Sequence, residues 1–109
     1  YLGTFKRTYK HGYGIFILPG SVSYGQFYHD NLIDGYRFNK YENVIYKGYF
    51  NEDKFYFGEV HNLETGEIYY GEYSEEKRNG YGYTKKSVNE EIENTGLWKN
   101  NKLIYKVSL

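Results

Sequence analysis

The chain has 109 residues with 16 Tyr, 7 Phe, 1 Trp and 13 Gly, and it contains no Ala, Cys or Met. The absence of Cys excludes a disulfide framework and a cysteine zinc site. Equal numbers of acidic and basic residues give zero net charge, which excludes a strongly basic nucleic-acid-binding surface. Aromatic residues favour strands and Gly favours turns, whereas helix formers are scarce. The composition therefore predicts an all-β chain.

The charge is spread unevenly along the chain. Residues 1–50 hold six Lys or Arg and three Asp or Glu, and residues 51–109 hold eight and eleven, which leaves +3 and −3. The sequence has no signal peptide, no N-x-S/T acceptor and no run of 18 apolar residues, so we expect a cytoplasmic protein. Because the chain begins at Tyr1 and lacks Met, we also expect it to be a piece of a longer protein.

A motif recurs at a nearly fixed period. The first glycines of the motif are separated by 22, 23, 23 and 25 residues, at Gly3, Gly25, Gly48, Gly71 and Gly96. An aromatic residue follows two positions after each of them, at Phe5, Phe27, Phe50, Tyr73 and Trp98. Tyr1, Tyr46 and Tyr69 stand two positions before the glycine in three units. The spacing predicts five tandem units, over residues 1–22, 23–45, 46–68, 69–93 and 94–109, the last being a degenerate capping unit.

Two further landmarks complete each unit. Nine to eleven residues after the first glycine comes a second motif, Gly12-Tyr13-Gly14 in the first unit and Gly80-Tyr81-Gly82 in the fourth, reduced to Gly35 and Gly58 in between. Residues that tolerate positive φ follow at Gly20, Asn43 and Gly66, and the longer last spacing moves this turn to Asn89. Each unit is therefore predicted to be a β-hairpin whose return strand starts near the second motif.

Residues two apart in a strand share a face, so stacked hairpins should line up the aromatic residues in one stripe. The opposite face, with Gln26, Lys47 and Glu72, is expected to be polar and solvated. Two interpretations of the stripe stay open: the core of a thin curled sheet, or a groove for a partner. The candidate partner-binding residues are Tyr1, Phe5, Phe27, Tyr46, Phe50, Tyr69, Tyr73 and Trp98. We expect the hydroxyls of Tyr46 and Tyr69 to be free to bond the partner.

No pattern predicts catalysis, a cofactor or a metal. The positions of the third glycine of a nucleotide-binding motif hold Ile17 and Lys85. The three histidines, His11, His29 and His61, form no ligand pair. The acid pairs Glu52-Asp53, Glu75-Glu76 and Glu90-Glu91 fall in expected loops, where solvated charge is the ordinary role. We therefore expect no catalytic residue, no bound metal and no cofactor.

The two complete motifs resemble the MORN (membrane occupation and recognition nexus) repeat. The likeness rests on Tyr1-Leu2-Gly3-Thr4-Phe5 followed by His11-Gly12-Tyr13-Gly14, and on Tyr70-Gly71-Glu72-Tyr73 followed by Asn79-Gly80-Tyr81-Gly82. It covers essentially the whole chain, although the second and third units have one glycine where the family has two. The resemblance implies one elongated, twisted sheet of tandem antiparallel hairpins.

The resemblance also implies a non-enzymatic scaffold that docks a protein partner, cytoskeleton-associated or membrane-associated, with an amphipathic helix along the aromatic groove. Hairpins about 10 Å apart and a helix rise of 1.5 Å per residue predict anchors six or seven residues apart. One alternative is a module that binds membrane phospholipid or phosphoinositide, which zero net charge disfavours. Another is an accessory N-terminal module of an enzyme such as a lysine methyltransferase or a lipid kinase. Nucleic acid is not an expected partner, and the oligomeric state stays open.

Overall fold

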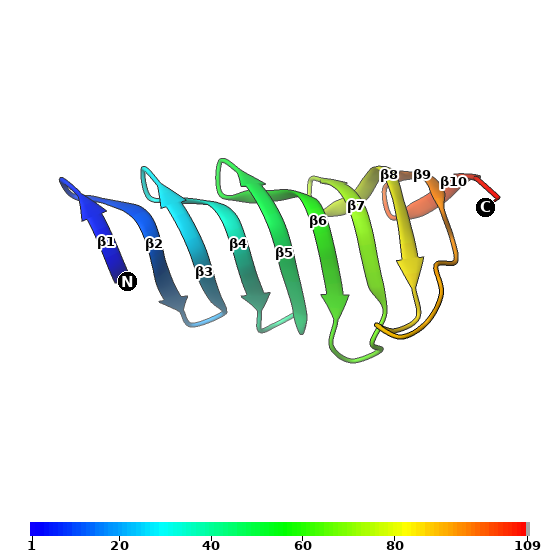
Figure 1. Ribbon diagram of the computed structural model, residues 1–109, viewed down its shortest axis with the longest axis horizontal. Helices are drawn as coiled ribbons and strands as arrows, with labels where there is room; N and C mark the ends of the chain where they lie inside the picture. The colour runs from blue at the N-terminus through cyan, green and yellow to red at the C-terminus, as the bar shows by residue number, and fades with distance from the viewer. Residues whose placement is uncertain (109) are drawn as a thin grey trace.

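The computed structural model describes residues 1–108, which form one open antiparallel sheet of ten strands in sequence order (Figure 1). The strands are β1 Leu2–Lys6, β2 Tyr9–Leu18, β3 Ser21–Tyr28, β4 Asn31–Asn39, β5 Val44–Asn51, β6 Lys54–Asn62, β7 Ile68–Ser74, β8 Lys77–Lys85, β9 Gly96–Lys99 and β10 Lys102–Lys106. These residues contain no helix, and hence none that could span a membrane. The predicted all-β fold of five antiparallel hairpins in one elongated sheet is confirmed.

The sheet is long and narrow, with the first and last hairpins at its two ends (Figure 1). Its principal extents are 50 × 24 × 21 Å. Ten strands at a spacing of about 4.8 Å predict a length of roughly 45 Å, so the long axis runs across the strands. Each hairpin therefore contacts mainly its sequence neighbours, as in other repeat proteins.

Two kinds of connection lie along opposite edges of the sheet (Figure 1). Within the hairpins, two-residue turns occur at Arg7-Thr8, His29-Asp30, Glu52-Asp53, Glu75-Glu76 and Asn100-Asn101. In the last four turns both residues have positive φ, as type I′ turns require. The connections between hairpins hold Gly20, Asn43, Gly66 and Asn89, where the sequence predicts turns, and they range from two residues at 19–20 to ten at 86–95. The two-residue turns within the hairpins, called the tight turns below, come earlier in the sequence than expected. The second glycine motif therefore lies inside the return strands rather than at their start.

A row of paired glycines crosses nine strands. Successive cross-strand partners are Gly3, Gly14, Gly25, Gly35, Gly48, Gly58, Gly71, Gly82 and Gly96. A Cβ added at Gly48 would lie 2.2 Å from the Phe57 carbonyl oxygen, and φ at Gly48 is +151°. The backbones thus approach too closely for any side chain, which explains why both glycine motifs recur at the repeat period.

The aromatic residues of the repeat form the core on one side of the sheet, here called the inner face. One cluster consists of Phe27, Leu32 and Phe50, and a second consists of Val60, Tyr69 and Trp98. Two half-buried rings, Tyr46 and Phe55, pack against both clusters. The core is therefore divided into two parts that meet at these rings.

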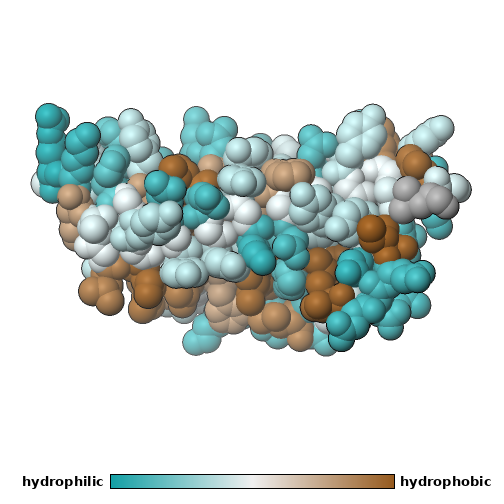
Figure 2. Space-filling model, in the orientation of Figure 1, coloured by the Kyte–Doolittle hydropathy of each residue, from teal (hydrophilic) through white to brown (hydrophobic). Residues whose placement is uncertain are grey.

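The opposite, outer face is not the polar surface that the sequence predicts. Gln26, Lys47 and Glu72 do lie there, but exposed apolar residues surround them, including Leu2, Tyr13, Ile17, Tyr24, Tyr36, Tyr49 and Tyr81. Tyr24 and Tyr36 stack across β3 and β4 with ring centroids 5.4 Å apart. Figure 2 shows hydrophobic residues gathered along one long edge of the molecule, below the first six strands in this view. The expectation failed because it was drawn from a few positions next to the glycines.

Candidate functional site

The eight candidate partner-binding residues differ widely in exposure. Phe27, Phe50, Tyr69 and Trp98 are buried, with 5% or less of their surface accessible. Tyr1, Tyr46 and Tyr73 are half-buried, and Phe5 is 58% exposed. Four of the eight thus belong to the core, and only the rest present a ring to a partner.

Tyr1 and Tyr69 explain what the tyrosine of the motif does in the complete units. The Tyr69 hydroxyl lies against Gly71 and Gly82, and it donates a hydrogen bond of 2.8 Å to the Glu72 carbonyl oxygen. Tyr1 lies in the same way against its own glycine pair and donates to the Thr4 carbonyl at 2.9 Å. The hydroxyl of Tyr69 is therefore used inside the fold, contrary to the expectation that it is free.

Tyr46 breaks this arrangement. Its hydroxyl donates to the Glu42 carboxylate at 3.1 Å instead of to a carbonyl in its own strand. Its ring contacts Phe55, with centroids 5.3 Å apart, and Tyr73, at 5.9 Å. Phe55 and Tyr73 are 5.5 Å apart, so the three rings form one half-buried cluster between the third and fourth hairpins.

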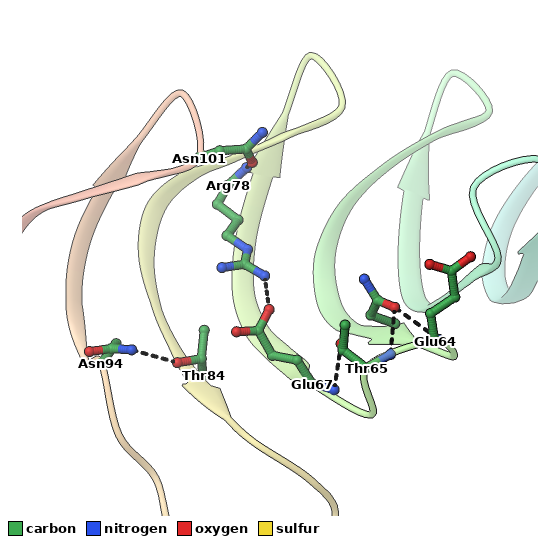
Figure 3. Close-up of polar contacts among 8 residues, drawn as sticks. Glu64, Thr65, Glu67, Arg78, Thr84, Asn94 and Asn101 are labelled. Atoms are coloured by element: carbon green, nitrogen blue, oxygen red, sulfur yellow. Dashed lines mark hydrogen bonds and ion pairs between the residues drawn. The ribbon is translucent and has the colours of Figure 1, made fainter.

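Basic side chains cover most other rings of the inner face. Lys10 Nζ lies 3.9 Å from the centre of the Phe16 ring. The Arg37 guanidinium lies 5.1 Å from the Phe50 ring. Arg78 lies 5.0 Å from Tyr69 and 5.1 Å from Trp98, and it is held by an ion pair of 2.5 Å to Glu67 (Figure 3). Cations placed over aromatic faces in this way are favourable.

Neighbouring hairpins are joined at the tight turns by a recurring hydrogen bond, which we call the staple. The second turn residue of one hairpin accepts a bond from a backbone N–H at the start of the return strand of the preceding hairpin. The pairs are Asp30 with Lys10 N at 2.7 Å, Asp53 with Leu32 N at 2.9 Å, and Asn101 with Arg78 N at 2.8 Å. Asp53 also accepts from the Arg37 guanidinium at 2.9 Å. Three of the four junctions are closed in this manner.

The junction between the third and fourth hairpins lacks the staple. There the second turn residue is Glu76, and within residues 1–108 no hydrogen bond joins it to the equivalent donor, Phe55 N. The side-chain oxygens of Asp and Asn lie three bonds from Cα, whereas those of Glu lie four bonds away. The longer side chain of Glu76 does not bond this N–H, and Glu76 is exposed.

A hollow of about 130 Å³ opens at this junction. The rings of Tyr46, Phe50, Phe55 and Tyr73 line it, together with Arg37, Asn39, Glu42, Asp53, Lys54, Glu75 and Glu76. The rings are half-buried or buried, while Glu42, Lys54, Glu75 and Glu76 are exposed at the rim. The hollow thus has an aromatic floor and an acidic rim, and it lies where the two core clusters meet.

The hydroxyls in the hollow keep their protons well above neutral pH. Burial raises the pKa of Tyr46, and the nearby phenol of Tyr73 and the carboxylates of Glu42 and Glu76 raise it further. Burial likewise raises the pKa of Tyr73, an effect that Arg78 opposes and that Glu42 and Glu76 reinforce. Both phenols are therefore neutral, and the same two carboxylates raise the pKa of both.

A second hollow of about 150 Å³ lies near the first two tight turns and has the opposite charge. Its lining consists of Lys6, Arg7, Tyr9, His11 and His29, without a carboxylate. The buried Nδ1 atom of His11 has no hydrogen-bond partner within residues 1–108. The excess of positive charge in residues 1–50 is thus concentrated at one end of the sheet.

Sequence reasoning found Tyr46, Phe50 and Tyr73 but missed Phe55, Glu42 and Glu76. The signal for Glu76 was present, because aligned second turn residues are Asp, Asp, Glu and Asn in hairpins two to five. Phe55 occupies the position of Lys10, Leu32 and Arg78 in the other hairpins.

No three side chains of the metal-binding types gather anywhere in the part of the chain that the structure describes. No protein-family model matches the chain, and no curated protein is significantly similar to it.

Proposed function

We propose that this chain is a non-enzymatic module of the MORN type that binds a helical or extended segment of a protein partner across its inner face. The observation that carries the proposal is the hollow at Tyr46, Phe55 and Tyr73. Elsewhere the aromatic residues of the repeat are mostly buried, as Phe27 and Trp98 are, whereas these three rings remain half-buried around a concave site. Concave, largely aromatic sites with a few polar groups are typical of ligand recognition.

The position of the hollow suits an elongated partner. It is lined by residues of the second, third and fourth hairpins, near the middle of a molecule 50 Å long. A segment that crosses the strands there meets a new hairpin about every 10 Å. One bulky anchor seated in the hollow would leave flanking residues over Arg37 on one side and Arg78 on the other. Tyrosine-rich surfaces bury much area with a polar group left over, which favours this use.

A displayed library of helical 24-residue peptides, selected against the folded chain, tests the proposal. The selected peptides should shift the ring resonances of Tyr46 and Tyr73 in NMR spectra. Tyr46→Leu removes the hydroxyl and the flat ring at little cost in volume, and it should weaken binding at least tenfold. Tyr24→Leu on the outer face is the matched control and should leave binding unchanged. Peptides that bind equally to both variants, or selection that yields none, would contradict the proposal.

The basic hollow supports a second candidate function, attachment to an anionic phosphate group such as a phosphoinositide headgroup. Lys6 and Arg7 supply two positive charges there, beside the imidazole rings of His11 and His29. Attraction to an anionic membrane is worth about 1 kcal/mol per basic residue close to the surface. We rank this function below peptide binding because the four groups belong to one end of a molecule with zero net charge.

Vesicle sedimentation separates the two candidates. Vesicles with 5% phosphatidylinositol bisphosphate should pull down the chain if the headgroup binds, and Lys6→Gln/Arg7→Gln should abolish the effect. Neutral phosphatidylcholine vesicles are the control. Equal sedimentation with both vesicle types would exclude a headgroup site at this hollow.

A further inference from the structure

We infer that the hollow at Tyr46, Phe55 and Tyr73 accepts a lysine or arginine side chain of the partner. The inference rests on the proposed peptide-binding function and specifies the chemistry of the anchor. It comes from two independent properties of the site, the rings that lack a covering cation and the charge of the rim.

The first property is a difference between these rings and most other rings of the inner face. Lys10, Arg37 and Arg78 place their positive charges over Phe16, Phe50, Tyr69 and Trp98. In the described part of the chain no basic side chain lies over Tyr46, Phe55 or Tyr73. The residue at the position of Lys10 and Arg78 in this hairpin is Phe55 itself, so the unit has a further ring where two other units have a cation.

The second property is the excess of negative charge. Arg37 is neutralised by its ion pair of 2.9 Å with Asp53. The charged groups that remain around the hollow are Lys54 against Glu42, Glu75 and Glu76. The net charge of the rim is therefore −2. Burial is the main cause of the raised pKa of Tyr46 and Tyr73, and the carboxylates of Glu42 and Glu76 raise both further, although Arg78 opposes the rise at Tyr73. Carboxylates at the rim of an aromatic site favour a cation and disfavour an acidic side chain.

The way in which the chain builds the hollow agrees with this occupant. A staple at this junction would bring a short acidic or amide side chain down onto Phe55 N, but Glu76 leaves its carboxylate at the rim. Tyr46 turns away from the glycine row and toward Glu42. Both departures add a polar group to the mouth of the hollow. An apolar anchor would gain nothing from these groups, whereas an ammonium or guanidinium can bond to them.

Lys54 is the internal competitor. It lines the hollow and is exposed, and it forms no ion pair among residues 1–108. If the hollow attracts cations, Lys54 weakens the binding of an external one by repulsion or by occupying the rim itself. Replacing Lys54 should then strengthen binding, whereas a merely apolar hollow would not respond to this change.

The test titrates single blocked amino acids into the isotopically labelled chain and follows the ring resonances of Tyr46, Phe55 and Tyr73. N-acetyl-lysine methylamide and its arginine analogue are the probes, and the norleucine analogue, of similar shape and without charge, is the control. We expect dissociation constants on the order of millimolar for the two cations, and binding of norleucine at least about fivefold weaker. Glu42→Gln/Glu76→Gln should abolish the preference, and Lys54→Gln should tighten cation binding about twofold to threefold.

A matched variant excludes general attraction to acidic surfaces. Glu90→Gln/Glu91→Gln removes an exposed acid pair from the connection between β8 and β9 and should leave binding unchanged. Norleucine binding as tightly as lysine, absence of a saturable shift, or an equal effect of both double variants would overturn the inference. Library peptides that occupy the hollow without a basic anchor would overturn it too, but would leave the proposed function in place.

Discussion

The junction between the second and third hairpins and the junction between the third and fourth have the same glycine register but differ in the contacts at their turns. At the first, Asp53 accepts the Leu32 N–H and pairs with Arg37, and the core beneath it is closed over the buried Leu32. At the second, Glu76 makes no equivalent bond and a hollow opens above Phe55. The turn residues of the two junctions thus differ by one methylene, and the junction without the staple holds the candidate binding site.

The largest effect should come from Phe50, which lies between these two junctions. Phe50→Ala removes a buried ring that packs against Leu32, Phe27 and Phe55, and should lower the free energy of unfolding by about 3 to 5 kcal/mol. Phe5→Ala, at a ring that is 58% exposed, should cost much less. Urea unfolding followed by circular dichroism measures both. If Phe50→Ala unfolds no earlier than Phe5→Ala, the stability of the sheet does not depend on contacts between neighbouring hairpins.

The stapled and open junctions should differ in their response to truncation. Asp53→Ala leaves the Leu32 N–H without its acceptor and removes the carboxylate from Arg37, which keeps its bonds to the Asp53 carbonyl and the Ser23 hydroxyl, and should cost about 1 to 3 kcal/mol. Glu76→Ala at the open junction removes no such bond and should change stability by less than about 0.5 kcal/mol. Asp53→Asn is the control, since it retains the acceptor for the N–H. Equal losses in the two alanine variants would show that the staple does not stabilise the junction.

Installing the missing staple should make the two junctions alike. Glu76→Asn places an oxygen three bonds from Cα, and Asn tolerates the φ of +62° at this position better than Glu does. We expect a gain of about 1 kcal/mol in urea unfolding, from one hydrogen bond and the relieved backbone. The lysine probe should bind more weakly to this variant. A variant that gains stability but binds the probe unchanged would show that Glu76 is not part of the site.

The smallest effect concerns pH, because the tyrosines of both junctions stay protonated over the neutral range. The pKa values of Tyr46, Tyr69 and Tyr73 are raised in the folded chain above the ordinary value of 10.0, mainly by burial. The folded state therefore holds these protons more tightly than the unfolded state. Its stability should be constant from pH 7 to 9 and fall as the pH rises above about 10. A free energy of unfolding in urea that stays constant as the pH rises above about 10 would contradict this.

The sequence was sufficient to predict the sheet and its hairpins, and the reason is the glycine period. Gly3, Gly25, Gly48, Gly71 and Gly96 mark one strand in every hairpin, so the strand order follows from their spacing alone. The position of the tight turns was predicted less well, because Glu52-Asp53 and Glu75-Glu76 adopt positive φ without glycine. Charged residues in a type I′ turn give no local signal that distinguishes them from an ordinary loop.

The candidate site could be predicted only in part, because its decisive contacts join different hairpins. The aromatic positions of the motif identify Tyr46 and Tyr73 but do not show that Tyr69 is buried and that Tyr46 is not. That difference depends on which partner each hydroxyl finds, Glu42 for one and the Glu72 carbonyl for the other. The meaning of Glu76 emerges only when its turn is placed beside Phe55 of the preceding hairpin.

The unbroken row of glycine pairs fixes the register and the spacing of the hairpins along the sheet. Because glycine faces glycine at every step from Gly3 to Gly96, each hairpin follows the previous one in the same register and adds the same increment, about 10 Å, to the length. The second hairpin contributes His29 to the basic hollow and Arg37 and Asn39 to the acidic one, so a unit inserted on either side of it would break one of the two hollows. The array can therefore gain or lose units only outside the first four hairpins if both charged hollows and the distance between them are to stay the same.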